Sequence, residues 1–299
     1  MKDQFRFKTI ALATDLSGTD SAALQYAQSI ARANDSTLVL IHVIDPLGYA
    51  FPRGIPEMLS ANLLAREELR RIENEAHSQG IQIHSVVESG IVCERILQSM
   101  QDHNADLLIL GTKGRTEAGP VALGTVARQL LARSRCPIMT VSPMAAIAAP
   151  WTVRCRRILV ATDFSAASIS GLRWAQETAR RQVIALHVTR DANDGDCLYD
   201  LEKLRSLTTD SAHNTPIEHL ITTGIAGQQI AAYADKCAAD LVVLGSPENE
   251  LTEEEFQSST VLQVISHVTC PVLCMPVTWD SLIPGFAADG QIRQDTVLQ

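Results

Sequence analysis

Four residues of this chain are spaced as a loop that could hold a phosphate. Gly111, Gly114, Gly124 and Thr125 form the pattern G-x2-G-x9-G-T directly after the apolar run 106–110. A chain that leaves a buried strand over glycines can bring backbone N–H groups close to an anion, because glycine has no Cβ in the way. Gly124 and Thr125 also fall near the start of the next helical pattern, and a helix N-terminus favours phosphate. The spacing therefore predicts phosphate binding; the alternative is a turn and a helix start that need glycine for their own geometry.

The elements that would position this loop alternate between strand and helix. We expect strands at 9–14, 37–44, 81–87, 106–110 and 137–141. We expect helices at 19–33, 57–79, 92–103 and 121–133, with Gly80 ending the second of them. Five strands joined by helices need right-handed crossovers, so the pattern predicts an α/β fold with a doubly wound, five-stranded parallel sheet. Ligands of such sheets bind beyond the carboxyl ends of the strands, where Asp15, Val43 and Gly111 fall.

Most of this pattern occurs twice. Ile10-Ala-Leu-Ala-Thr-Asp-Leu-Ser17 returns as Ile158-Leu-Val-Ala-Thr-Asp-Phe-Ser165, and Ala105-Asp-Leu-Leu-Ile-Leu-Gly111 returns as Ala239-Asp-Leu-Val-Val-Leu-Gly245. Leu40-Ile-His-Val43 and Cys136-Pro137 return as Ala185-Leu-His-Val188 and Cys270-Pro271. Such repeats indicate one module used twice. We therefore expect domains at 1–145 and 155–278, followed by a tail at 279–299.

Composition limits the function classes. A chain of 299 residues is long enough for two domains, and 46% hydrophobic residues with only 4% aromatic ones indicate aliphatic packing. The net charge of −9 and the lack of a basic stripe argue against nucleic-acid binding. An anionic ligand must therefore be held by local backbone donors.

The cysteines and the N-terminus indicate a compartment. Seven cysteines lie scattered without a C-x2-C pair, so we expect free thiols rather than zinc ligands or disulfides. The first residues lack an apolar signal region, and no apolar run reaches the ~18 residues that a membrane span needs. We expect a cytoplasmic protein with no membrane span.

In their order and spacing, these residues resemble those of the universal stress proteins in a tandem two-domain form. The resemblance covers nearly all of 8–275 and rests on Ala13-Thr-Asp15-x-Ser17, on His42-Val43 and on the glycine pattern that ends at Thr125. It implies two adenine-nucleotide α-hydrolase-like domains. It also implies a stress-response protein that binds ATP and has a regulatory or protective role rather than a metabolic catalytic one.

The resemblance assigns cofactor-binding residues in the first module: Ala13, Thr14, Asp15, Val43, Gly111, Thr112, Gly114, Arg115, Gly124 and Thr125. It implies that Ala13 and Asp15 lie by the adenine and the ribose, and that Val43 packs on the adenine. Gly111 and Gly114 would approach the ribose and the phosphates, and Arg115 would add positive charge. Gly124 and Thr125 would hold the phosphates, with the Thr125 hydroxyl as a further donor or a route to Mg²⁺. No catalytic or metal-ligating residue is assigned.

The second module departs from the pattern where phosphates would bind. Glu248 occupies the position of the second glycine, Ser258 matches Gly124, and Pro247 removes a backbone donor. Four more glutamates follow between 250 and 255. We expect no triphosphate there, although Asp163 and Val188 leave room for a nucleoside or another small ligand.

Two further functions compete with non-enzymatic ATP binding. Ser17-Gly-Thr-Asp-Ser21 resembles the S-G-G-x-D-S loop of ATP pyrophosphatases, with Thr19 in place of the second glycine, although Ser17 or Thr19 could equally begin a helix. The other alternative is an interaction scaffold with no bound nucleotide. At most we expect slow ATP hydrolysis or autophosphorylation, which the family resemblance allows and these residues do not show.

The last strand of each module suggests how the two modules associate. Single modules of this family pair through their last strands, so 137–141 and 271–275 are expected to pair within the chain as an intramolecular pseudo-dimer. The apolar Ile138, Met139, Val272 and Leu273 fit this pairing. The sequence leaves open whether two chains form a homodimer, and it names no protein partner.

Overall fold

The computed structural model describes residues 7–16, 22–46, 54–112, 123–143, 145, 155–190, 194–208, 215–246, 255 and 258–277. The first module contains β1 (Thr9–Ala13), α1 (Ala22–Asn34), β2 (Thr37–Ile44), α2 (Gly54–Ser78), β3 (Ile83–Ser89), α3 (Val92–Asp102), β4 (Leu107–Gly111), α4 (Thr125–Arg133) and β5 (Ile138–Val141). The second contains β6 (Arg157–Ala161), α5 (Ala166–Thr178), β7 (Gln182–Thr189), α6 (Asp194–Ser206), β8 (Ile217–Thr223), α7 (Ala226–Lys236), β9 (Leu241–Gly245), α9 (Thr260–His267) and β10 (Val272–Met275).

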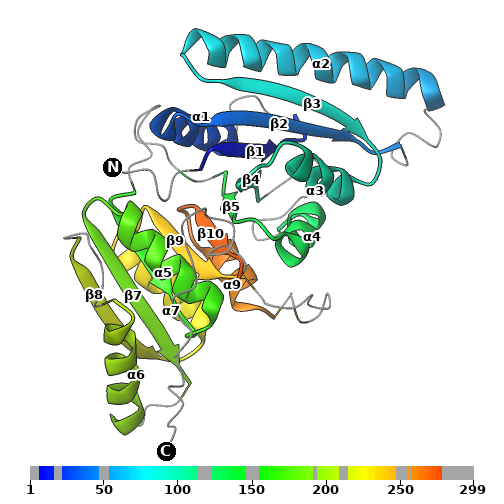
Figure 1. Cartoon of the computed structure of the whole chain (residues 1–299). Coiled ribbons are helices and arrows are strands. Elements are labelled where there is room, and N and C mark those ends of the chain that lie inside the picture. Colours follow the sequence, from blue (N-terminus) through cyan, green and yellow to red (C-terminus); the bar gives the residue numbers. More distant parts are fainter. Residues whose placement is uncertain are drawn as a thin grey trace, which may run out of the picture.

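The strands form one ten-stranded sheet in the order β3-β2-β1-β4-β5-β10-β9-β6-β7-β8, in which each half reverses the order of the other. All pairs within a module are parallel, and β5 meets β10 in the antiparallel sense, with Met139 opposite Leu273. Figure 1 shows the two halves on either side of this junction. The expected α/β fold with two parallel five-stranded units is confirmed, as is the pairing of the last strands.

Helices cover both faces of the sheet because the strand residues alternate between two apolar clusters. One cluster joins Ile10 and Leu12 to residues of α1, α2, α5 and α6, such as Leu69 and Leu204. The other joins Ala11 to residues of α3, α4, α7 and α9, such as Ile96. Strands buried on both sides account for the continuous aliphatic runs in the sequence.

The two modules also exchange aromatic contacts at their junction. Trp174 of α5 is 2% exposed, and its ring centroid lies 6.0 Å from that of Phe7, which precedes β1. In the repeat, Tyr26 of α1 corresponds to Trp174, and Cys155, which precedes β6, corresponds to Phe7. Burial, together with the nearby Cys270, Cys155 and Asp240, raises the pKa of Tyr26 to about 12. Trp174 of the second module therefore packs against the start of the first, and Tyr26 of the first module lies near Cys155 at the start of the second.

Element ends differ from the expected ones by a few residues. The third strand begins and ends two residues later than expected, and α2 begins at Gly54, so Pro56 falls in its first turn, where proline is tolerated. Gly80 follows α2 with φ +77, which confirms its role as a helix stop. The expected start of the first helix and residues 121–122 lie outside the described residues, as does the tail 279–299.

Two expectations about the whole chain can be compared with the structure. All seven cysteines are described and are free thiols, although only Cys93 and Cys274 are fully buried. Among the described helices, none combines the length and the apolar character required to cross a bilayer. The domain bounds at 1–145 and 155–278 stay a prediction.

Candidate functional site

Several predicted site residues that the structure describes lie at the carboxyl ends of three adjacent strands. Ala13 at the end of β1 is in register with Ile41 of β2 on one side and with Leu110 of β4 on the other. Val43 and Gly111 follow near the ends of those neighbouring strands. The chain runs from β1 to β2 on one side and reaches β4 on the other, so β1 and β4 flank the topological switch point, where ligands of doubly wound sheets bind.

A tight turn after β1 presents Asp15 at this edge. The Thr14 N–H donates to the Ile41 carbonyl (3.0 Å), and the Leu16 N–H donates to the Thr14 hydroxyl (3.1 Å). Leu16 has φ +57, a left-handed conformation that is uncommon for a non-glycine residue. His42 Nδ1 lies 2.9 Å from the Thr14 carbonyl oxygen, and since a carbonyl can only accept, Nδ1 carries the proton. The half-buried Asp15 therefore lies on a turn that these hydrogen bonds fix.

The second module builds the same turn. His187 Nδ1 lies 2.7 Å from the Thr162 carbonyl oxygen, and Phe164, with φ +65, donates its N–H to the Thr162 hydroxyl at 3.0 Å. The recurrence of histidine in both modules therefore has a structural explanation, because each ring bonds the chain that carries the aspartate. Catalysis is not needed to explain it.

The two ends of the glycine loop meet in the first module. The Gly124 N–H donates to the Thr112 carbonyl (3.1 Å), and the Thr112 N–H donates to the Val141 carbonyl (3.1 Å). Thr112 is buried, and Thr125 is exposed as the first residue of α4. Gly114 and Arg115 lie outside the described residues, so their predicted contacts stay predictions.

The N-terminus of α4 differs from that of its counterpart α9. Gly124, the N-cap of α4, makes no side-chain cap bond, whereas the Ser259 hydroxyl caps α9 by accepting the Leu262 N–H (3.3 Å). In α4 the Arg128 guanidinium instead donates to the Thr125 hydroxyl at 3.3 Å. Residue 262, which matches Arg128, is leucine. Within the residues that the structure describes, α4 thus begins with a cation beside an N-terminus whose N-cap makes no side-chain bond, which is a favourable surrounding for an anion.

Arg128 was missed by reasoning from the sequence. It lies within a helix, three residues beyond the glycine pattern, where arginine is ordinarily a solvated surface residue. The available signal was its replacement by Leu262 in the module whose glycine pattern is degraded.

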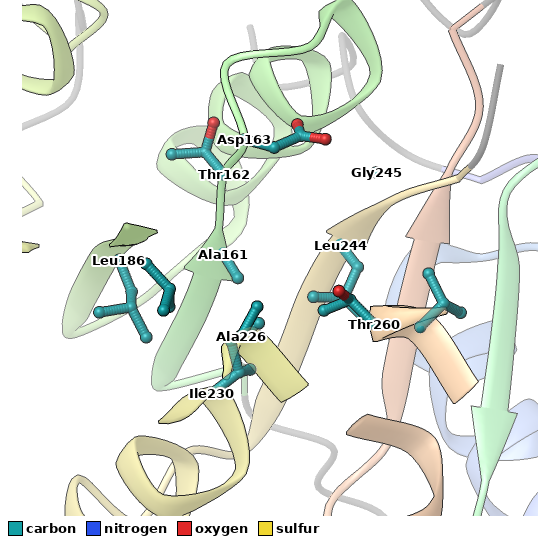
Figure 2. A pocket seen from close by; sticks show the side chains of 11 residues that line it. Ala161, Thr162, Asp163, Leu186, Ala226, Ile230, Leu244, Gly245 and Thr260 are labelled. Atoms are coloured by element: carbon teal, nitrogen blue, oxygen red, sulfur yellow. The ribbon is translucent and has the colours of Figure 1, made fainter. Parts of the chain in front are cut away.

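A cavity of about 120 Å³ lies at the corresponding edge of the second module. Figure 2 shows it between the ends of β6 and β9, with Ala226 and Ile230 of α7 on one side and Thr260 of α9 on another. Asp163, the counterpart of Asp15, lies at its rim beside Thr162. Over the described ranges, no three His, Cys, Asp or Glu side chains are grouped as metal ligands would be.

Gly245, which ends β9, lines this cavity but is also required for packing. A Cβ at Gly245 would lie 2.8 Å from the backbone nitrogen of Ser168 and 3.1 Å from the Cβ of Ala167, both in the first turn of α5. A backbone atom cannot rotate away as a side chain can. Close approach of α5 therefore accounts for Gly245 without any ligand.

Gly245→Ala is accordingly expected to lower the free energy of unfolding by about 1–3 kcal/mol, because the added methyl group overpacks the strand–helix contact. Urea denaturation of the full chain, without added ligand, measures this loss. Wild-type stability in the variant would show that α5 can shift and that packing does not require glycine at this position.

Comparison with known proteins also finds two copies of one module in this chain. The sequence model of the universal stress protein family matches residues 6–142 and 154–276. Universal stress protein MJ0531 of Methanocaldococcus jannaschii is 28% identical over 142 residues, which are 45% of this chain and 82% of that protein. A universal stress protein of Thermus aquaticus is 30% identical over 135 residues, 45% of this chain and 98% of the relative.

A solved structure agrees over both modules. The crystal structure of a universal stress protein from Archaeoglobus fulgidus has a TM-score of 0.71 at 20% identity and covers 90% of this chain and 98% of its own. At that identity the likeness concerns the fold alone.

Proposed function

The chain belongs to the universal stress protein family, and from that premise we propose that its first module binds ATP in a regulatory or protective role under stress. The observation that carries the proposal is the start of α4. There, among the described residues, a helix N-terminus whose N-cap is glycine, the Arg128 guanidinium and the end of the glycine loop come together. The second module, whose glycine pattern is degraded, has Ser259 as a cap and leucine in place of Arg128.

The phosphates are expected at this helix start. The N–H groups of the first turn of a helix point toward an anion, and a guanidinium gives charge-assisted hydrogen bonds to phosphate oxygens. The N–H of Gly124 already bonds the Thr112 carbonyl, so Gly124 is not expected to donate to phosphate. Its lack of a side chain would instead allow phosphate to approach the backbone. The Thr125 hydroxyl lies at the same point and would offer a further donor or a route to Mg²⁺.

The nucleoside half of ATP is expected along the ends of β1 and β2. Asp15 offers a carboxylate that can accept from ribose hydroxyl groups, and Ala13 and Val43 offer small apolar surfaces for the base. Asp15 and the start of α4 lie on the two sides of the switch point between β1 and β4. ATP would therefore extend from the end of β2 across β1 toward α4.

Rapid turnover is not part of the proposal. Fast phosphoryl transfer requires a positioned base together with carboxylates that hold the metal. Within the described part of the first module, the histidine nearest the site, His42, is bonded to the turn after β1. The pyrophosphatase-like residues 17–21 lie outside the described residues and add no support.

The proposal is tested by the identity and stoichiometry of nucleotide bound to the purified full chain, before and after addition of Mg-ATP. We expect one ATP per chain, since only one module has the features that favour phosphate. Pyrophosphate release should stay at the level of a protein-free blank. No bound nucleotide at millimolar ATP would refute the proposal and favour a scaffold, and two ATP per chain would refute the assignment to the first module alone.

A further inference from the structure

Two histidines of the first module face each other at one edge of the sheet, away from the proposed ATP site. His84 is the second residue of β3, the end strand of the ten-stranded order, and His103 is the C-cap of α3 (Figure 1). Both side chains are half-buried. Because His84 lies near the start of its strand, the pair belongs to the amino ends of the strands, whereas the proposed ATP site lies at their carboxyl ends.

The separation of the two rings is suited to a shared metal ion. His84 Nε2 lies 3.4 Å from His103 Nδ1, and the ring centroids are 5.0 Å apart. Hydrogen bonds from N–H donors are most often about 2.9–3.0 Å long between heavy atoms, so this separation is long for a bond from one ring to the other. Two nitrogen ligands of one tetrahedral Zn²⁺, each about 2.0–2.1 Å from the metal, lie about 3.3–3.4 Å apart. The two nitrogens therefore have the spacing of two ligands of one ion.

The protonation states of the pair are compatible with this role. A metal binds the lone pair of a neutral imidazole, whose proton is then on the other ring nitrogen. Among the described residues, neither His84 Nδ1 nor His103 Nε2 has a hydrogen-bond partner that would demand the opposite tautomer. Burial lowers the pKa of His84, and His103 lowers it further, while Glu73 acts in the other direction. A lowered pKa keeps the His84 imidazole neutral, which is the form that binds a metal.

The second module does not reproduce the pair. Glu218 occupies the position of His84 in the strand register, and Cys237 is the C-cap of α7 as His103 is that of α3. The Glu218 carboxylate accepts a hydrogen bond from the Gln182 amide at 2.9 Å, and burial raises the pKa of the Cys237 thiol. A protonated thiol is a poor metal ligand, since the thiolate is the form that binds. The second module thus provides a matched comparison for the first.

We propose that His84 and His103 together bind one divalent transition-metal ion, for which Zn²⁺ has the matching geometry. Imidazole is a common ligand of such ions. No third His, Cys, Asp or Glu side chain is grouped with the pair in the part of the chain that the structure describes, so water would complete the coordination. Glu73 of α2 adds a negative charge nearby, which favours a cation. One ligand comes from β3 and the other from the end of α3, so the ion would fasten the edge strand to the helix that follows it.

The test titrates the chelator-treated full chain with ZnCl₂ by calorimetry. In the wild type we expect one saturable site that either His84→Gln or His103→Gln weakens at least about tenfold, because the second ligand of a chelated ion binds as an intramolecular group. The double variant should bind no more weakly than the weaker single variant, since the two rings act as one unit. Zn²⁺ should also raise the midpoint of thermal unfolding of the wild type, and not of either variant, because the ion binds only the folded arrangement of β3 and α3.

Two control variants assign the site. His77→Gln removes an exposed histidine near the end of α2, and Cys237→Ser changes the matched residue of the second module; both should bind Zn²⁺ as the wild type does. Circular dichroism without metal shows whether each variant is folded. The proposal is overturned if either single histidine variant keeps wild-type affinity, if Cys237→Ser removes the site, or if the wild type shows no saturable binding at millimolar Zn²⁺. None of these results depends on whether the first module binds ATP.

Discussion

Replacing Gly114 with glutamate is expected to weaken ATP binding by the full chain about 100-fold. The change copies Glu248, the residue at the matching position of the second module. A carboxylate about 5 Å from a phosphate oxygen costs about 3 kcal/mol at the effective dielectric of a protein surface, and each 1.4 kcal/mol is a factor of ten in affinity. Calorimetry with Mg-ATP measures the loss, and thermal unfolding without nucleotide shows whether the variant remains folded.

Two companion variants separate the charge of the loop from the start of the helix. Arg128→Leu copies Leu262 and should weaken ATP binding about tenfold, because it removes the cation next to Thr125. The reciprocal Glu248→Gly should not create a second ATP site, since Ser259 still caps α9. If both Gly114→Glu and Arg128→Leu bind ATP with wild-type affinity, the assignment of the phosphate site to the first module is wrong.

The sequence predicted the frame of the site well because that frame depends on local patterns that occur twice. Continuous aliphatic runs followed by Asp15 or Asp163, and by Gly111 or Gly245, place the strand ends. The pairing of β5 with β10 followed from the apolar last strands and the family resemblance, and the register of Met139 with Leu273 bears it out.

What the sequence could not provide are contacts between residues that are distant along the chain. The resemblance assigned Gly124 and Thr125 to phosphate binding; the structure adds that the Gly124 N–H bonds the Thr112 carbonyl and that the Arg128 guanidinium lies beside the Thr125 hydroxyl. Gly245 repeats Gly111, and the close approach of the α5 backbone explains why glycine stands there. The residue type limits the roles that a position can have, and contacts with residues distant along the chain decide which role it takes.

The junction of the modules gives the second large expected effect. Trp174→Ala should lower the free energy of unfolding of the full chain by about 3–5 kcal/mol, because it removes a buried ring that contacts Phe7 of the other module. Trp174→Phe is the matched control. It keeps an aromatic ring at this position and removes the five-membered ring of the indole with its N–H, which has no hydrogen-bond partner among the described residues, so a smaller loss than that of Trp174→Ala is expected.

A double-mutant cycle separates the contact between modules from packing within the second module. Phe7→Ala and Trp174→Ala are measured singly and together by urea denaturation of the full chain. If the two rings stabilise each other across the junction, the double variant should lose about 0.5–1.5 kcal/mol less than the sum of the single losses. Strict additivity would show that Trp174 acts only within its own module. In that case the antiparallel pairing of β5 with β10, rather than the exchanged aromatic rings, would carry the association of the modules.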